Sequence, residues 1–156
     1  MDHGYSLAQP GRSYRSGGKR GEGGYWCACD DPATWALELD ALRVMSRTRD
    51  DFLLLKRELR SLRDLAAEGK LYYGPDSDVV RSQSADLILE LRFRRRLEYP
   101  DGGTKVVRLY FSEPAHMRLA LVAAKLAVKS DDDGGLEAQT QHMAEAQLRI
   151  LKFLGV

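Results

Sequence analysis

Six basic side chains lie between residues 87 and 111, interleaved with leucines that belong in a core. Arg92 and Arg94 are two residues apart, as are Arg108 and Tyr110 in the segment that follows, so each pair has the same odd or even spacing along its segment (the same parity). Because side chains alternate between the two faces of a strand, all four are predicted to face solvent on a hairpin. Guanidinium groups match phosphate oxygens in shape and charge, so this cluster predicts a phosphate-binding site.

Two lysines of the next apolar segment, Lys125 and Lys129, are predicted to extend the basic patch at its rim. Like charges on neighbouring strands repel, and a protein tolerates them most readily where an anion usually lies between them. The formal net charge of the whole chain is only +1, so the positive field is local. A solvated edge strand that uses charge to prevent aggregation explains the same composition and stays open as an alternative.

The composition is typical of one globular domain, with 156 residues of which 44% are hydrophobic and 30% charged. No apolar run approaches the roughly 20 residues of a membrane-spanning helix, and the first residues lack the apolar segment of a secretory signal. A cytoplasmic protein without a membrane partner is expected. Cys27 and Cys29 are too close for an easy disulfide and lack the second Cys/His pair of a zinc site.

Residues 1–24 are rich in glycine, serine and arginine and are predicted to form a flexible arm that buries little surface. The alternative is that the sequence begins upstream of the true start. Residues 25–156 are predicted to form a single domain whose folded part begins near Trp35. There Trp35, Leu37 and Leu39 alternate with polar residues, which favours a short strand, although a helix fits as well.

The remaining elements follow from hydrophobic spacing. Residues 50–69 predict an amphipathic helix that ends at Gly69, and residues 41–49 predict an earlier helix or its extension. A hairpin over residues 87–111, an inner strand over 118–129 that is covered on much of both faces, and a closing helix over 136–154 complete the order. The predicted fold is α+β, an antiparallel-rich sheet with its helices on one face. The arginines have the parity of the open face, except for Arg95, which has core parity and should lie at a twist.

These elements carry a family resemblance. Glu90-Leu91-Arg92, the motif Arg108-Leu109-Tyr110-Phe111, an apolar strand ending in lysine, and Met143-Ala144-Glu145-Ala146 in the final helix occur in order. Together they resemble the RelE/HigB-type toxins of the RelE/ParE superfamily over roughly residues 35–154. The segment from 59 to 92 also resembles the helix, glycine, proline-containing loop and strand that precede the Glu-Leu-Arg motif there.

The resemblance implies the toxin of a type II toxin–antitoxin pair, a RelE-like fold, and cleavage of messenger RNA, usually on the ribosome, without a metal or cofactor. It also implies a cognate antitoxin, expected to be a helix-turn-helix protein. Such cleavage needs a base for the 2′-hydroxyl proton, an acid for the leaving oxygen, and cations for the charge on the phosphorane. The residues expected to act in catalysis are Arg92, Arg108, Tyr110 and Lys125. Those expected to bind RNA are Arg94, Arg96, Lys105 and Lys129.

The sequence departs from that family pattern where proton transfer is concerned. No histidine lies in the hairpin, and His3, His116 and His142 are more readily explained as solvent-facing or capping residues. The final helix also has no tyrosine near its end. Two alternatives therefore stay open: a ParE-like toxin that inhibits DNA gyrase without cleaving RNA, and a degenerate RelE-fold binding module.

Overall fold

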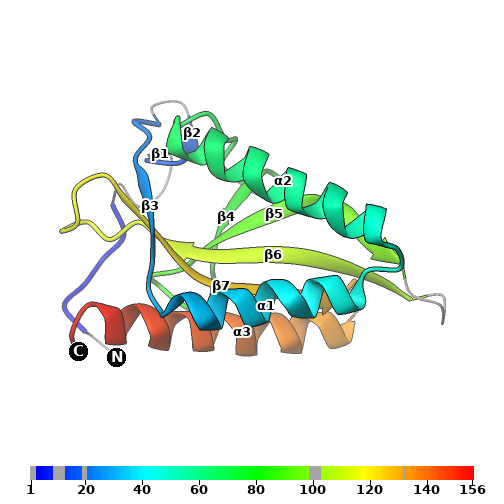
Figure 1. The fold of residues 1–156 in the computed structure, drawn as a ribbon. Helices are drawn as coiled ribbons and strands as arrows, with labels where there is room; N and C mark the ends of the chain where they lie inside the picture. The colour runs from blue at the N-terminus through cyan, green and yellow to red at the C-terminus, as the bar shows by residue number, and fades with distance from the viewer. Residues whose placement is uncertain (1–2, 9–12, 19–20, 99–102, 132) are drawn as a thin grey trace.

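The computed structural model describes residues 3–8, 13–18, 21–98, 103–131 and 133–156 (Figure 1). It confirms the α+β class: a five-stranded sheet is combined with three helices. The predicted turn at 99–102 lies outside the described residues. None of the helices in the described part of the chain has the length and apolar character to traverse a membrane.

The main sheet has the strand order β3-β7-β6-β5-β4. β3 (Tyr25–Ala28) runs parallel to β7 (Ala120–Ser130), whereas β6 (Thr104–Ser112), β5 (Leu89–Glu98) and β4 (Val79–Arg81) continue the sheet in antiparallel fashion. The sheet is therefore mixed. The predicted hairpin is the β5–β6 pair, and the predicted inner strand is β7, with a neighbour on each side.

The first helix, α1, covers Pro32–Met45, where a short strand around residues 35–39 was favoured. That expectation is wrong, and the reason lies just upstream. The Asp31 carboxylate accepts a hydrogen bond from the backbone N–H of Thr34 at 2.9 Å, and Pro32 occupies the first helical turn. A side-chain cap followed by proline starts a helix whatever the local alternation.

The second helix, α2 (Arg49–Ala67), confirms the prediction for residues 50–69. The Thr48 hydroxyl accepts a hydrogen bond from the N–H of Asp51 at 3.1 Å and caps its start. Acidic side chains at Asp50 and Asp51 favour the same end of the helix dipole. Gly69, at φ 71°, takes the left-handed conformation that ends the helix. Since α1 ends at Met45, residues 41–45 belong to an earlier helix.

The helices cover both faces of the sheet, so the expectation that they pack on one face is wrong. Leu55, Leu59 and Leu62 of α2 pack against one face, whose strand residues include Leu91, Leu109 and Phe111. The third helix, α3 (Asp133–Phe153), packs against the opposite face. Its Met143, Ala146 and Ile150 belong to one buried cluster with the strand residues Tyr110, Val122, Ala124 and Ala127. Figure 1 shows α2 on one side of the strands and α3 on the other.

The N-terminal segment packs on the domain where the structure describes it. β1 (Ser13–Tyr14) and β2 (Gly17–Gly18) form a small antiparallel pair, and the Tyr14 side chain is fully buried. The Glu113 carboxylate, also buried, accepts hydrogen bonds from the Ser16 hydroxyl at 2.6 Å and from the backbone N–H of Arg15. Arg15 and Ser16 are buried as well, so this part of the segment packs against the domain through a polar anchor that composition does not reveal.

Candidate anion-binding site

The β5–β6 hairpin brings Arg92 and Arg108 together, as their positions on the same face of the two strands predicted. Arg92 lies opposite Arg108 in the register of the two strands. Further along, Arg96 lies opposite Val106, so three residues of β5 face the single Val107 of β6. A bulge of this size bends the strand and increases its twist without changing the parity of Arg96. The guanidinium groups of Arg92 and Arg108 therefore start from neighbouring positions on one face.

The bulge is held by α2. The Glu58 carboxylate accepts hydrogen bonds from the backbone N–H groups of Arg94 and Arg95, the latter at 3.2 Å. These donors have lost their partners in the β ladder, and a carboxylate is a strong acceptor for them. Arg95 thus lies at a twist of the strand, as its core parity predicted, and its side chain is half-buried. The helix under the sheet fixes where the arginine side chains leave the strand.

A buried carboxylate lies between the paired arginines. Glu90 is only 1% exposed, and its Oε1 accepts hydrogen bonds from Arg108 Nε at 2.7 Å and Arg92 Nε at 3.1 Å. Gln139 of α3 donates from its Nε2 to the other carboxylate oxygen. Burial lowers the pKa of Arg108, Glu90 raises it, and Arg92 lowers it. The anion expected between these cations is therefore supplied in part by Glu90 of the protein itself.

An open hollow of about 430 Å³ lies beside this charge pair. We call it the arginine hollow; its lining residues are Tyr72, Asp76, Ser77, Asp78, Arg92, Phe93, Arg94, Arg96, Val106 and Arg108. The Arg94 side chain is 83% exposed and lies 3.6 Å from Asp78. Arg96 is also well exposed and pairs with Asp131 at the rim. Both guanidinium groups are solvent-exposed, so they can turn toward an anion in the hollow at a lower cost than the buried guanidinium group of Arg108.

Tyr110 does not face solvent, which corrects its predicted placement. The side chain is 0% exposed, covered by α3, with its ring centroid 6.2 Å from that of His142. Its hydroxyl has no hydrogen-bond partner among the described residues. Burial, followed by the nearby Glu90 charge, raises the pKa of Tyr110 well above its usual value. A nucleobase cannot stack on this ring without displacing α3.

The lysines of β7 are turned toward α3 rather than into the arginine hollow. Lys125 forms ion pairs with Glu145 of α3 and, at 3.9 Å, with Glu38 of α1. Lys129 donates to Gln139 Oε1 at 2.6 Å. Burial lowers the pKa of Lys129, with Glu90 acting in the opposite direction. Lys105 is half-buried at the start of β6, opposite Leu97. None of these three lysines is among the residues described as lining the hollow.

Two of the lining residues that were not predicted, Asp78 and Tyr72, carry groups that could take part in chemistry. The Asp78 carboxylate accepts a hydrogen bond from the backbone N–H of Tyr72 at 3.1 Å and also faces Arg94. The Tyr72 ring is 73% exposed at the edge of the hollow. The sequence signal was weak, because both belong to the segment around Gly74 and Pro75 that the composition assigned only to a loop. Within the described part of the hollow there is no histidine.

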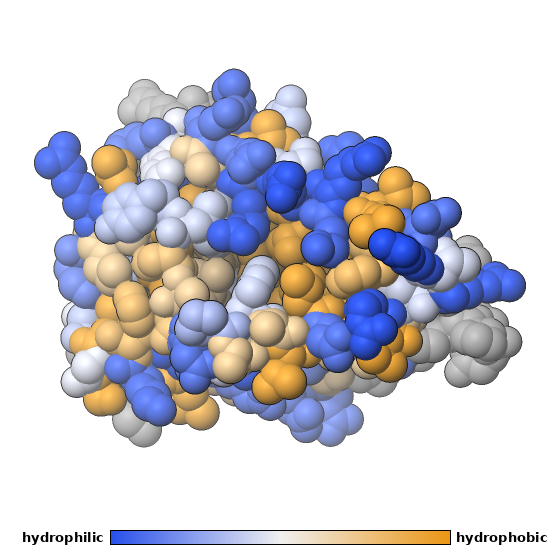
Figure 2. Space-filling model, in the orientation of Figure 1, coloured by the Kyte–Doolittle hydropathy of each residue, from blue (hydrophilic) through white to orange (hydrophobic). Residues whose placement is uncertain are grey.

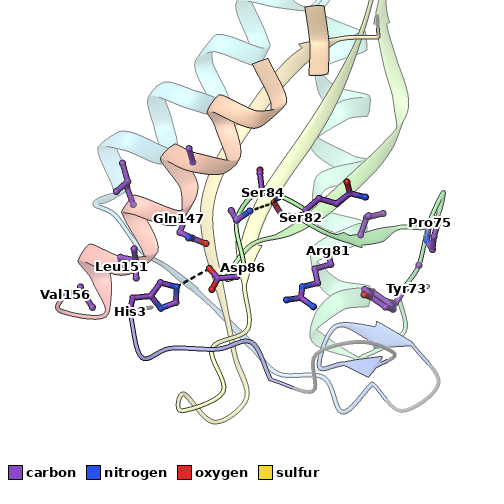
Figure 3. A pocket seen from close by; sticks show the side chains of 16 residues that line it. His3, Tyr73, Pro75, Arg81, Ser82, Ser84, Asp86, Gln147, Leu151 and Val156 are labelled. Atoms are coloured by element: carbon purple, nitrogen blue, oxygen red, sulfur yellow. Dashed lines mark hydrogen bonds and ion pairs between the residues drawn. The ribbon is translucent and has the colours of Figure 1, made fainter. Parts of the chain in front are cut away.

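A larger hollow of about 1100 Å³ lies elsewhere, between β4, the residues that follow it and the C-terminal half of α3 (Figure 3). At its edge His3 Nε2 lies 3.0 Å from Asp86, and His3 Nδ1 accepts the backbone N–H of Tyr5 at 3.2 Å. Both ring nitrogens are therefore engaged, which suits a structural role. Arg81 and Gln147 also line this hollow, but none of the hairpin arginines does.

No protein-family model matches the chain, and no curated protein or solved structure matches it either. Among the described residues, no group of three or more His, Cys, Asp or Glu side chains is arranged to hold a metal ion. What the arginine hollow can do therefore follows from its own chemistry: four guanidinium groups, of which those of Arg92, Arg94 and Arg96 are exposed or half-exposed, two carboxylates and one tyrosine ring.

Proposed function

We propose that the chain is the toxin of a type II toxin–antitoxin pair, and that it binds and cleaves messenger RNA at the arginine hollow. The observation that carries this proposal is the convergence of Arg92, Arg94 and Arg96 on a hollow that also holds an exposed tyrosine. Guanidinium forks bind phosphate, and an exposed aromatic ring offers a surface on which a base can stack. When the short strands β1, β2 and β4 are left aside, the element order is strand, two helices, three long strands and helix, which is the order expected from the resemblance to RelE/HigB-type toxins and supports the proposal.

The chemistry suggested for the site is metal-independent transesterification. Asp78 is the candidate base for the 2′-hydroxyl proton, because its carboxylate lines the hollow and is held by Tyr72 N–H and Arg94. The Tyr72 hydroxyl is the candidate donor to the leaving 5′-oxygen. Arg92 and Arg94 would stabilise the negative charge that develops on the phosphorane. In this scheme Arg108 acts through Glu90, and the buried Tyr110 has no direct part.

A second candidate function is favoured by the state of Tyr110 and Lys125. One is buried under α3 and the other is paired with Glu145 and Glu38, so two of the four side chains expected to act in catalysis are away from the hollow. This favours a protein that binds its target without cleaving it. The gyrase-inhibiting toxin and the binding module are the two forms of that alternative.

Induced expression tests the proposal, with messenger RNA integrity, growth and plasmid supercoiling measured together. Growth arrest with fragmented messenger RNA is expected. Arg92→Ala with Arg94→Ala should abolish both effects, because losing one donor to a developing oxyanion typically costs about 10²- to 10³-fold in rate. Arg118→Ala, which removes an exposed arginine just before β7, should leave both effects unchanged.

Asp78→Asn separates cleavage from binding. If Asp78 is the base, the variant should bind RNA as the wild type does and cleave it about 10²- to 10⁴-fold more slowly. Growth arrest with intact RNA and inhibited supercoiling would instead select the gyrase-inhibiting toxin. Absence of any toxicity would contradict the toxin proposal and leave the binding module. A small helix-turn-helix protein encoded beside this chain would support an antitoxin partner.

A further inference from the structure

A third hollow, of about 590 Å³, lies between α1, α2 and β3 on the side of the molecule that carries α2. We call it the tryptophan hollow. Two tryptophan rings, Trp26 and Trp35, form part of its lining together with Leu39, Leu53 and Leu59. The remaining lining is basic apart from Asp64, and the cations come from successive turns of α2: Lys56, Arg57, Arg60 and Arg63.

Arg63 shows the character of this hollow most clearly. Its guanidinium carbon lies 5.4 Å from the ring centroid of Trp26 and 5.7 Å from that of Trp35. The Trp26 indole N–H donates to the backbone carbonyl of Arg63 at 2.9 Å, which fixes ring and helix together. Arg63 Nε is buried without a hydrogen-bond partner among the described residues. Burial lowers the pKa of Arg63, and the nearby Asp64 offsets this only in part.

Two further hollows, each of about 450 Å³, connect the tryptophan hollow with the arginine hollow. The first lies at the junction of α1 and α2 and shares Leu53 with the tryptophan hollow. The second shares Arg47 and Thr48 with the first and Arg96 with the arginine hollow. Each of the four hollows therefore shares at least one lining residue with the next, and we call the series the basic track. Figure 2 shows hydrophilic side chains over α2 and near its junction with α1, with hydrophobic residues between them.

The charge of the basic track contrasts with that of the whole chain. Twelve basic and four acidic residues line the four hollows, whereas the chain has a formal net charge of +1. Several of the cations already have acidic partners, among them Arg43 with Asp40 and Arg96 with Asp131. The basic residues are Arg43, Arg47, Arg49, Lys56, Arg57, Arg60, Arg63, Arg92, Arg94, Arg95, Arg96 and Arg108. A local excess of this kind attracts a polyanion from a distance.

We infer that the basic track binds single-stranded RNA that leaves the arginine hollow, runs along α2 and places a base against the tryptophan hollow. The inference rests on the proposed function and adds the path and length of the substrate. Aromatic rings at both ends of a line of cations are the arrangement with which proteins hold single strands. The other polyanion that could bind such a surface is an acidic amphipathic helix of a protein partner, which must bury its own apolar stripe. The two middle hollows offer that stripe three apolar side chains, Phe52, Leu53 and Leu97, and this favours RNA.

The dimensions suit a strand of several nucleotides. α2 has 19 residues and is therefore about 28 Å long. Single-strand binding surfaces commonly hold about 4 to 16 nucleotides. Phosphates along α2 would contact Arg57 and Arg60, both exposed, before the strand reaches Arg63.

Tryptophan fluorescence tests the inference directly, because Trp26 and Trp35 are the two tryptophans of the chain. The probe is a 2′-O-methyl oligouridylate of about twelve nucleotides, which lacks the nucleophile for cleavage and matches this site size. It should quench the fluorescence of the full chain. The affinity should fall as salt rises, with log K decreasing by about 0.7 per phosphate contact for each unit of log salt.

Arg57→Ala with Arg60→Ala should weaken binding of this probe about tenfold and reduce the salt slope by about 1.4, the value for two contacts. Both side chains are exposed, so the variant should fold, which circular dichroism can verify. Arg118→Ala with Lys152→Ala removes the same charge from exposed positions outside the track and should change neither quantity. The matched pair separates contact along α2 from a loss of net charge.

Each result bears on the inference separately from cleavage. Quenching with a lower salt slope in the α2 variant supports the basic track, even if the wild type cleaves no RNA. Messenger RNA cleavage with no quenching, and with equal binding by the α2 and control variants, would overturn the track while leaving the proposed function intact. Quenching by an acidic helical peptide but not by RNA would also overturn it and assign the surface to a protein partner.

Discussion

Replacing Glu90 by glutamine removes one buried charge and almost no volume, and it should destabilise the fold strongly. The Glu90 carboxylate is the acceptor for Arg108 Nε at 2.7 Å and for Arg92 Nε at 3.1 Å. The Arg108 side chain is only 11% exposed, so the variant leaves a buried guanidinium without its charge partner. Removing one member of a buried ion pair typically costs about 3–5 kcal/mol.

The hydrogen bonds around Glu90 place the cost within this range and leave little room for relaxation. Gln139 donates from Nε2 to Glu90, and its Oε1 accepts from Lys129 Nζ at 2.6 Å. An amide nitrogen in place of the second carboxylate oxygen would face the N–H donor of Gln139. Turning the Gln139 amide around would set its NH₂ group against the Lys129 ammonium. Because neither orientation satisfies every donor, we expect a loss of about 4 kcal/mol.

Urea denaturation at neutral pH measures this loss, and thermal unfolding measures it independently. For a chain of this size about 4 kcal/mol corresponds to a fall in Tm of about 8–16 °C. Glu137→Gln, at an exposed position of α3, makes the same chemical change and should alter stability by less than about 0.5 kcal/mol. Adding Arg108→Met to Glu90→Gln should recover part of the loss, because no buried charge then lacks a partner. A Glu90→Gln variant within about 1 kcal/mol of wild type would refute the assigned role of this carboxylate.

Two further predictions concern buried groups away from the hairpin. Burial raises the pKa of Glu113 above 4.5, so the folded state holds this proton more tightly than the unfolded chain. Its contribution to stability should therefore fall as pH rises from 4.5 toward the raised pKa, and Glu113→Gln should flatten that part of a stability profile measured by urea denaturation. Burial also raises the pKa of Cys29 from 9.0 to about 11. At pH 8 Cys29 should react with iodoacetamide about 100-fold more slowly than an unperturbed thiol, as measured by mass spectrometry, and a rate like that of a free cysteine would contradict the raised pKa of this half-buried thiol.

The hairpin and its arginine pair were predictable because they depend on parity alone. Arg92 and Arg108 lie opposite each other because each is on the polar face of its own strand. The bulge sets three residues of β5 opposite one residue of β6, so Arg96 remains on the same face as Arg92. Helix α2 was equally accessible, because its apolar stripe, acidic start and terminal glycine all give the same boundaries. For the hairpin and for α2, the local sequence signals were consistent with one another, and the structure has the elements that they predicted.

The placement of α3 could not be predicted from its own periodicity, which fixes an apolar stripe and not the surface that the stripe covers. The signal lay in β7 instead. Its nearly continuous apolar run indicated cover on both faces, and small side chains such as Ala120, Ala124 and Ala127 let α3 approach the sheet closely. Given both observations, a helix over the face of Tyr110 follows. Parity alone could not separate Tyr110 from the exposed arginines, because it names a face without saying how much of that face is covered.

Because α3 covers part of the sheet face, the arginine cluster has two parts: Arg108 is buried and bound within the protein, whereas Arg94 and Arg96 are exposed. Arg108 donates from Nε to Glu90 and from Nη1 to the Val107 carbonyl, so two of its three nitrogens are committed within the protein. Arg94 and Arg96 leave the strand at and after the bulge, and their pairs with Asp78 and Asp131 are solvent-exposed on the arginine side. An incoming phosphate competes far more easily with an exposed pair than with a buried one. Under the proposed function, RNA should therefore first meet Arg94 and Arg96 at the rim, while Glu90 holds Arg92 and Arg108 in place beneath them.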